Sequence, residues 1–369
     1  MSQETSNTGE AARARPQDPQ PQDSPPSGVR VATEGPPPPE APAPPRPPAE
    51  TEPEIAGRGP WQLAWERLRR DRVAMGSLVV IILIILFALA APLIAALTGH
   101  PPNQQFRDNG LTPDGLPVGP SSTFWFGTDD LGRDLFVRIA YGARVSLLVG
   151  VLATGVTMVV GVIVGLAAGY LGGVIDTILA RAVDVALSFP FYLFALMLVT
   201  ITGPSLELEI LVIAVFSWAA VARIVRGQTL SIREKEYVEA ARSLGANDRR
   251  IMFIDVLPNV MAQVIVYASL LIPSVIILDA TLCFLGLGTP PPAATWGTML
   301  SDSINYYRVA WWFIFFPGMA LLTTTVAFNL FGDGVRDAFD PDAERRLQVS
   351  PSREEATEVA EGVVEVTEG

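Results

Sequence analysis

Three residue types that carry much of protein chemistry are almost absent from this chain of 369 residues. It contains one cysteine, Cys283, one histidine, His100, and one lysine, Lys235. A single cysteine excludes an intrachain disulfide, and one cysteine with one histidine cannot form a four-ligand zinc site of Cys and His alone. We interpret Cys283 as a small packing residue and His100 as a solvated loop residue.

Several catalytic motifs are missing as well. The chain has no Gly-x-x-x-x-Gly-Lys-Ser/Thr phosphate loop, because its single lysine is followed by Glu236. It also has no Gly-x-Ser-x-Gly nucleophile elbow and no His-Glu-x-x-His pair. No dense basic face points to nucleic acid. We therefore expect no catalytic residues, no metal site, no cofactor bound by this chain and no nucleic-acid partner.

Charge is concentrated at the two ends of the sequence. Of the net charge of −12, residues 1–57 contribute nine acids against four arginines, and residues 342–369 contribute eight acids against three arginines. Residues 1–60 are also rich in proline and too poor in apolar residues to offset chain entropy. We predict a disordered Pro-rich cytoplasmic tail over 1–60 and an acidic disordered tail over 341–369, and we expect no cleaved signal peptide.

Between the tails the sequence is strongly apolar. Hydrophobic residues make up 49% of the chain and its mean hydropathy is +0.35. A helix of about 20 apolar residues crosses a bilayer core about 30 Å thick. The runs predict an all-α membrane protein with about six transmembrane helices, at residues 73–97, 145–170, 185–201, 206–222, 260–278 and 309–330.

These spans define the remaining segments. Residues 61–97 hold a short interfacial helix, over 61–72, followed by the first span. Residues 98–144 form an extracytoplasmic loop, and residues 145–340 form a core with five spans and a polar loop at 226–259. Glycines within the second span predict close helix packing. Asp134 and Arg138, one helical turn apart, are expected to pair and brace this span.

Positive charge sets the orientation. Arginines before the first span and seven basic residues between positions 223 and 250 fall on one side if six spans alternate, and that side is expected to be cytoplasmic. Both termini would then be cytoplasmic, in a multi-pass protein of a bacterial cell membrane. Asp176, Asp184 and Asp279 lie near predicted span ends, where water or Arg181 can partner them, so we interpret them as structural.

The polar loop at 226–259 predicts a helical hairpin. Residues 230–244 favour helix, and Gly245 is placed to end that helix in a left-handed cap. Asn247 can cap a second short helix that ends near Pro258. Ala240 and Ala241 leave room at the tip of the hairpin for the surface of another protein.

Several motifs in this order resemble a known family. Glu239-Ala240-Ala241, Gly245 and Leu257-Pro258 resemble the coupling loop of bacterial ABC importer permeases. Further segments resemble the C-type permease of dipeptide, oligopeptide and nickel transporters: residues 126–134, 284–288, 296–297 and 329–337. The resemblance covers about residues 61–341. Asp255 and Cys283 depart from it, since the family usually has an apolar residue or histidine at the first position and commonly serine at the second.

The resemblance implies a type I ABC importer permease fold and a function. It implies a membrane-spanning permease subunit, without enzyme activity, of an ATP-driven, binding-protein-dependent importer of di- or oligopeptides. The implied partners are a homologous second permease, two ATP-binding cassette ATPases that carry ATP-Mg, and an extracytoplasmic substrate-binding protein. The loop would couple to the ATPases through Glu239, Ala240, Ala241, Gly245, Leu257 and Pro258.

Two alternatives stay open at this point. The cargo could be a nickel complex or glutathione, and the residues that contact it are not identified. An ion-coupled secondary transporter would instead need broken helices and ionisable groups near the middle of the membrane.

Overall fold

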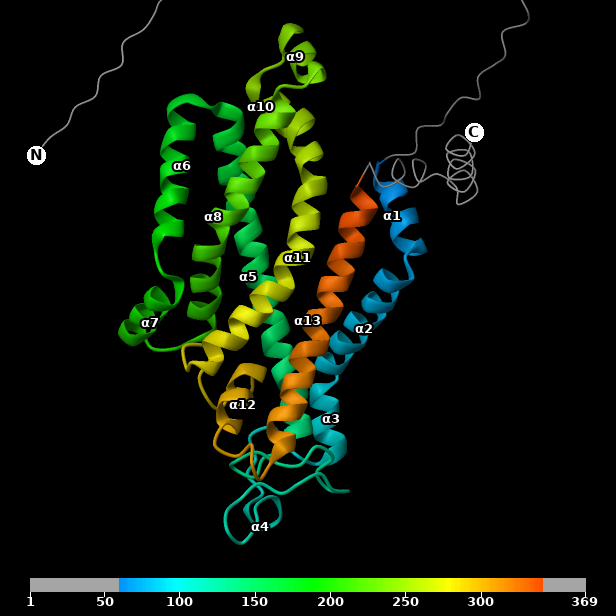
Figure 1. Cartoon of the computed structure of the whole chain (residues 1–369), viewed down its shortest axis with the longest axis vertical. Coiled ribbons are helices and arrows are strands. Elements are labelled where there is room, and N and C mark those ends of the chain that lie inside the picture. Colours follow the sequence, from blue (N-terminus) through cyan, green and yellow to red (C-terminus); the bar gives the residue numbers. More distant parts are fainter. Residues whose placement is uncertain (1–59, 341–369) are drawn as a thin grey trace, which may run out of the picture. The chain divides into compact units, whose positions relative to one another are not determined.

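The computed structural model describes residues 60–340, which form a helical bundle without a strand in that range (Figure 1). Five helices are long and apolar enough to cross a membrane: α2 (Arg72–Leu89), α5 (Leu135–Leu171), α8 (Leu206–Arg233), the continuous helix Asp248–Phe284, which includes α11 (Leu257–Phe284), and α13 (Trp311–Phe339). A bent helix pair is a sixth candidate. The prediction of about six apolar helices is confirmed. The predicted tails lie outside the described residues, apart from Pro60.

The first predicted span consists of two helices. The predicted interfacial helix is α1 (Pro60–Arg70), and Asp71 caps α2 by accepting hydrogen bonds from the N–H groups of Val73, at 2.8 Å, and Ala74, at 3.2 Å. A turn at Ala90 then separates α2 from α3 (Ala91–Thr98). The prediction of one helix over 73–97 is therefore wrong in its continuity.

The helix α5 begins at Leu135, not at residue 145, because Asp134 caps it. The Asp134 carboxylate accepts hydrogen bonds from the N–H groups of Phe136 and Val137. Gly161 and Gly165 pack directly on α8, and a Cβ at Gly165 would lie 2.6 Å from the carbonyl oxygen of Ala222. The predicted close packing through glycines is confirmed.

The span predicted at 185–201 is not one continuous helix. The structure has α6 (Gly173–Ser188) and α7 (Phe191–Thr202), bent by 80° at the break between them. The residue before a proline is disfavoured in the helical region, and Phe189, which precedes Pro190, is extended at φ −79° and ψ 133°. Apolar residues continue on both sides of the break, so the hydrophobic pattern alone did not reveal it.

The remaining helices define the two ends of the bundle (Figure 1). The helix α8 extends beyond its predicted end at residue 222 to Arg233. Beyond it, α9 (Glu236–Ser243), α10 (Asp248–Arg250) and the π-helical turn η1 (Ile251–Val256) lie at one end, called here the α9 end. The short helices α4 (Arg107–Gly110) and α12 (Trp296–Ser303) lie at the opposite end, called the α12 end.

Candidate functional site

The hairpin at the α9 end is set by a small number of local backbone features. The helix α8 stops at Arg233, and Lys235 is extended, so the predicted continuous helix over 230–244 is broken. Gly245 has φ +84°, the left-handed conformation predicted for it. The Asn247 side chain accepts a hydrogen bond from the Arg250 N–H at 2.9 Å, so the predicted cap is also confirmed.

The second helix of the hairpin does not end at Pro258. The turns α10 and η1 continue into α11, and Pro258 lies in the first turn of α11. A proline is tolerated there because the first N–H groups of a helix have no partner within it. The Asn259 side chain donates a hydrogen bond to the Asp255 carbonyl at 2.6 Å. Leu257 and Pro258 therefore join the hairpin to α11 without a hinge.

One side of the hairpin is anchored on the bundle. Val238, Ile251 and Val256 are fully buried and pack with residues of α5 and α8. The Tyr170 hydroxyl bonds to the Asp248 carboxylate at 3.0 Å. A displacement of the hairpin would therefore be transmitted to α5, α8 and α11 rather than absorbed by a loose loop.

The other side of the hairpin exposes apolar residues. Leu244 is 89% exposed, and about half of each side chain is exposed at Tyr237, Phe253 and Ile254. We call these four residues the exposed hairpin set. Partial burial, with the nearby Asp255 carboxylate, raises the pKa of Tyr237 above its ordinary value. Clustered exposed apolar side chains mark sites that contact another surface.

The predicted site residues divide between these two sides. Glu239, Ala240 and Gly245 are exposed near Leu244, and Ala241 is half-buried against the bundle. Leu257 and Pro258 lie at the base, where η1 meets α11. The structure thus brings the first four together at the tip and places the last two in the connection to a membrane span.

The α12 end has the opposite character, with charged groups buried and paired. Asp129 lies 2.6 Å from Arg133 and 3.2 Å from Arg138, and both partners are almost fully buried. The predicted pair of Asp134 with Arg138 is wrong, because Asp134 caps α5 and its second oxygen lies 2.6 Å from His100 Nδ1. These contacts brace the start of α5, as the sequence indicated.

His100 is not the solvated loop residue that the sequence suggested. Its side chain is only 12% exposed. The ring stacks on Phe124, with centroids 5.0 Å apart, and meets the edge of Phe106 at 4.6 Å. The sequence carried no signal for this, since the Asp134 partner lies 34 residues away.

A polar pocket of about 310 Å³ opens beside these ion pairs. Its lining includes charged residues and groups at the end of α11: Asp130, Arg133, Arg138, Cys283, Thr289 and Asp302. Burial raises the pKa of the Asp130 carboxyl above 3.8, and the Asp129 carboxylate adds to this effect. Burial likewise raises the pKa of Asp302. The pocket therefore presents both signs of charge in a partly dehydrated setting.

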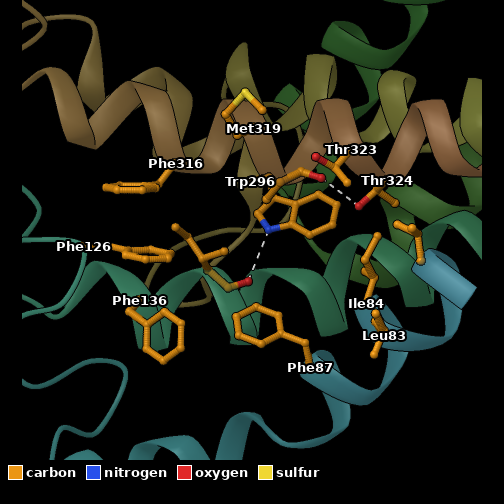
Figure 2. Close-up of a pocket in the computed structure, with 13 residues that line it drawn as sticks. Leu83, Ile84, Phe87, Phe126, Phe136, Trp296, Phe316, Met319, Thr323 and Thr324 are labelled. Atoms are coloured by element: carbon orange, nitrogen blue, oxygen red, sulfur yellow. Dashed lines mark hydrogen bonds between the residues drawn. The ribbon is translucent and has the colours of Figure 1, made fainter.

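A second pocket, of about 390 Å³, is apolar (Figure 2). It lies among α2, α5, α12 and α13, and no charged residue lines it. The rings of Phe126 and Phe316 stack at 3.9 Å, and the Trp296 indole donates a hydrogen bond to the Ile139 carbonyl at 3.2 Å. This pocket suits an apolar group and offers no charged side chain to a ligand.

The three aspartates that the sequence placed near span ends have different surroundings. Asp176 pairs with Arg226, at 2.5 Å and 2.7 Å, and Asp184 lies 3.0 Å from Arg223. Asp279 is fully buried and no arginine, lysine or histidine among residues 60–340 pairs with it. The interpretation of Asp279 as a water-accessible residue is therefore wrong.

Sequence reasoning also missed a buried acid, Glu209. Its side chain is 2% exposed and accepts hydrogen bonds from the Thr289 N–H and hydroxyl, both at 2.9 Å. Cys283, buried as predicted, donates to the other Glu209 oxygen at 3.3 Å. These partners lie 80 and 74 residues from Glu209, so no local pattern could reveal the contact.

Two family descriptions match this chain. Residues 161–345 match the family described as "Binding-protein-dependent transport system inner membrane component". Residues 59–113 match the "N-terminal TM domain of oligopeptide transport permease C".

Curated relatives match over most of their length. The chain is 41% identical to the dipeptide transport system permease protein DppC of Alkalihalophilus pseudofirmus, over 76% of this chain and 90% of the relative. It is 43% identical to the oligopeptide transport system permease protein OppC of Escherichia coli, over 78% and 93%. It is 40% identical to the glutathione transport system permease protein GsiD of Pectobacterium atrosepticum, over 77% and 92%.

A solved structure, an inward-facing conformation of the MetNI methionine ABC transporter, aligns with a TM-score of 0.46 and 19% identity, over 55% of this chain and 96% of that chain.

Proposed function

The chain belongs to the family of binding-protein-dependent transport system inner membrane components, and from this premise we propose that it moves peptides through its bundle under the control of ATPases docked on the α9-end hairpin. The resemblance identified in the sequence is thereby confirmed. The protein is a multi-pass inner membrane permease subunit with an ABC importer permease fold. The coupling hairpin, the orientation and the individual partners belong to the proposal.

The observation that carries the proposal is the two-sided hairpin. Its outer side exposes the apolar hairpin set, and its inner side is fully buried on α5 and α8. An ATPase that contacted Leu244 differently in its two nucleotide states would push a rigid element rather than a flexible loop. Glu239 and Ala240 lie beside that contact.

The basic residues of the hairpin support the proposed orientation. Basic residues are enriched in cytoplasmic loops, and the hairpin contains Arg242, Arg249 and Arg250. The α9 end is therefore assigned to the cytoplasm and the α12 end to the outside. Two ATP-binding cassette subunits, which carry ATP-Mg and hydrolyse it, would dock at the α9 end. A homologous permease would complete the pathway, and a substrate-binding protein would dock at the α12 end.

The proposed cargo is a short peptide. This choice of cargo rests on the names of the relatives, which include dipeptide and oligopeptide permease proteins. One further relative is named for glutathione, itself a small peptide-like solute. The charged pocket at the α12 end has the two signs of charge that a zwitterionic peptide would meet on arrival. The apolar pocket of Figure 2 has no charged lining residue to meet such a peptide.

The alternative of an ion-coupled secondary transporter has no support. The structure does contain a bent helix pair and buried carboxyls, which such a transporter would use. However, the chain matches 90% or more of the length of relatives named as permease proteins of transport systems.

A pair of glycine variants tests the coupling proposal. Gly245 and Gly99 both have positive φ, at +84° and +71°, and a Cβ at either position meets no atom within 4 Å. Valine costs about 1–2 kcal/mol in that backbone region at either site. Gly245→Val lies at the proposed ATPase contact, whereas Gly99→Val lies at the α12 end and is the matched control.

We expect Gly245→Val to abolish ATP-dependent peptide uptake in the assembled transporter while its amount in the membrane stays normal. Gly99→Val should retain uptake, because its local strain is the same but its position is remote from the ATPases. Equal uptake in the two variants would contradict the coupling role of the hairpin.

A further inference from the structure

The cluster formed by Glu209, Asp279 and Cys283 lies outside the proposed coupling surface and has an unusual composition. These residues come from the start of α8 and the end of α11, and they are 2%, 0% and 1% exposed. One oxygen or sulfur atom from each lies within 4.8 Å of the other two. Two carboxyls and a thiol are thus held together out of contact with solvent.

Such a group needs a positive partner. An ionised carboxylate removed from water is strongly destabilised unless a cation or a proton neutralises it. Within residues 60–340, no arginine, lysine or histidine forms an ion pair with Glu209 or Asp279. Negative charge on this cluster must therefore be neutralised either by a shared proton or by a cation that binds there.

Two unpartnered polar atoms point to a missing ligand. Asp279 Oδ2 and Ser146 Oγ are buried and have no hydrogen-bond partner within the described part of the chain. Ser146 is 1% exposed, and its hydroxyl lies beside the Asp279 carboxyl without the geometry of a hydrogen bond to it. Buried polar groups are nearly always satisfied, so these two atoms indicate space for a further polar contact.

The spacing of the donors suits a tetrahedral metal ion. Zinc binds thiolate sulfur at about 2.3 Å and carboxylate oxygen at about 2.0–2.2 Å, so a tetrahedral S···O edge is about 3.5 Å. Cys283 Sγ lies 3.3 Å from Glu209 Oε1 and 3.8 Å from Asp279 Oδ1. We propose that Glu209, Asp279 and Cys283 bind a divalent ion of the zinc type that links α8 to α11.

The surroundings of the cluster support this assignment. Thr289 donates two hydrogen bonds to Glu209 Oε2, so that Glu209 Oε1 is turned toward the Cys283 sulfur. Residues around a metal site commonly orient its ligands through hydrogen bonds of this kind. Gly288 closes the cluster, because a Cβ there would overlap Cys283 Sγ and lie 2.6 Å from Glu209 Oε1. Cys283 and Thr289 also line the charged pocket, which gives an ion access from the α12 end.

The donor set selects the type of ion. One thiolate with two carboxylates suits zinc or cobalt, whereas magnesium and calcium prefer oxygen ligands alone. On binding, the Cys283 thiol loses its proton to solvent and the sulfur takes its place on the metal. Affinity for the ion should therefore rise with pH.

Cobalt provides the direct test. The purified full chain, in detergent and freed of metal by a chelator, is titrated with Co²⁺ while the thiolate-to-cobalt absorption band in the near ultraviolet is recorded. Cys283 is the only cysteine, so any such band reports this site alone. We expect one Co²⁺ per chain, displaced by an equal amount of Zn²⁺.

Variants separate the site from binding by the thiol alone. Cys283→Ser should abolish the band. Thr289→Val should weaken Co²⁺ affinity by about 10–100-fold, because it removes a residue that orients Glu209. Asp279→Asn should weaken Co²⁺ affinity at least as much. Gly288→Ala should also abolish the band by filling the space beside the sulfur. Asp302→Asn, an acidic lining residue outside the cluster, is the matched control and should keep it.

Three results would overturn the proposal. The first is no band on the unmodified chain, which would mean that the two carboxyls share a proton instead. The second is a band that survives Cys283→Ser. The third is a band unchanged by Asp279→Asn, which would show that the thiol alone holds cobalt. If a variant fails to fold, the cobalt band of the unmodified chain and its displacement by Zn²⁺ still test whether the site binds a metal ion.

Discussion

The two ends of the bundle differ in how they hold their charged side chains. At the α9 end, Leu244 is 89% exposed, and further apolar residues are half exposed around it. At the α12 end, Asp129, Arg133 and Arg138 are buried and paired with one another. A fully exposed leucine and buried charged side chains are both uncommon in a protein without partners.

This difference indicates which end is held by its own ion pairs. The α12 end pairs Asp129 with Arg133 and Arg138, and these contacts hold the start of α5 in place. The α9 end leaves an apolar surface that only another protein would cover. Substitutions at the α12 end should therefore destabilise the fold, whereas substitutions at the α9 end should weaken the binding of a partner.

The largest effect should come from breaking the buried ion pairs. Asp129→Ala leaves Arg133 and Arg138 buried without their shared carboxylate, which costs about 3–5 kcal/mol. We expect a large fall in the thermal unfolding midpoint in detergent. Asp184→Ala is the control: Asp184 and Arg223 are 51% and 59% exposed, and loss of an exposed pair costs about 0–1 kcal/mol. Equal losses in the two variants would remove the contrast between buried and exposed pairs.

The next effect concerns the partner rather than the fold. Leu244→Glu places a charge at the most exposed residue of the exposed hairpin set, and loss of an interface anchor costs about 2 kcal/mol, or about 30-fold in affinity. Co-purification of the ATPase subunits should fall accordingly, while the unfolding midpoint of the isolated chain stays the same. A lower midpoint with normal co-purification would mean that Leu244 serves the fold.

A smaller effect should follow from replacing His100. His100→Phe keeps a ring against Phe124 but loses the contact with Asp134, at 2.6 Å. A hydrogen bond to a charged group contributes about 1.5 kcal/mol, so the unfolding midpoint should fall modestly. His100→Ala, which also removes the stacked ring, should lower it further. An unchanged midpoint in His100→Phe would show that the stacking alone matters.

The smallest effect is a dependence on pH at the α12 end. The pKa values of Asp130 and Asp302 are raised by burial above 3.8. Between 3.8 and the raised values, the folded chain holds protons that the unfolded chain has released, so stability falls as the pH rises through that window. Asp130→Asn should flatten this part of the profile in thermal unfolding at a series of pH values. A profile unchanged by the substitution would contradict the assignment.

Much of this architecture could be predicted from the sequence, because long apolar runs and local caps act over short distances. Gly245 and Asn247 were correctly predicted from neighbours within a few residues. The break at Phe189 was signalled by Pro190, but the apolar run around it outweighed that signal.

Contacts between distant residues could not be predicted in the same way. The pairing of Arg138 with Asp129 in place of Asp134 depends on how loop residues 99–134 fold over the start of α5. The burial of Glu209 depends on Thr289, which lies 80 residues away. Both are properties of the packed bundle, and the hairpin is more predictable because its conformation is local.

We propose that the α9-end hairpin lies in the cytoplasm beneath docked ATPases. Leu244→Cys tests this placement when it is made in a Cys283→Ser background, so that the new thiol is the only one in the chain. We expect a membrane-impermeant maleimide to label this thiol in inside-out vesicles but not in intact cells, and we expect bound ATPase subunits to protect it. Labelling from outside, or labelling unaffected by the ATPases, would contradict it.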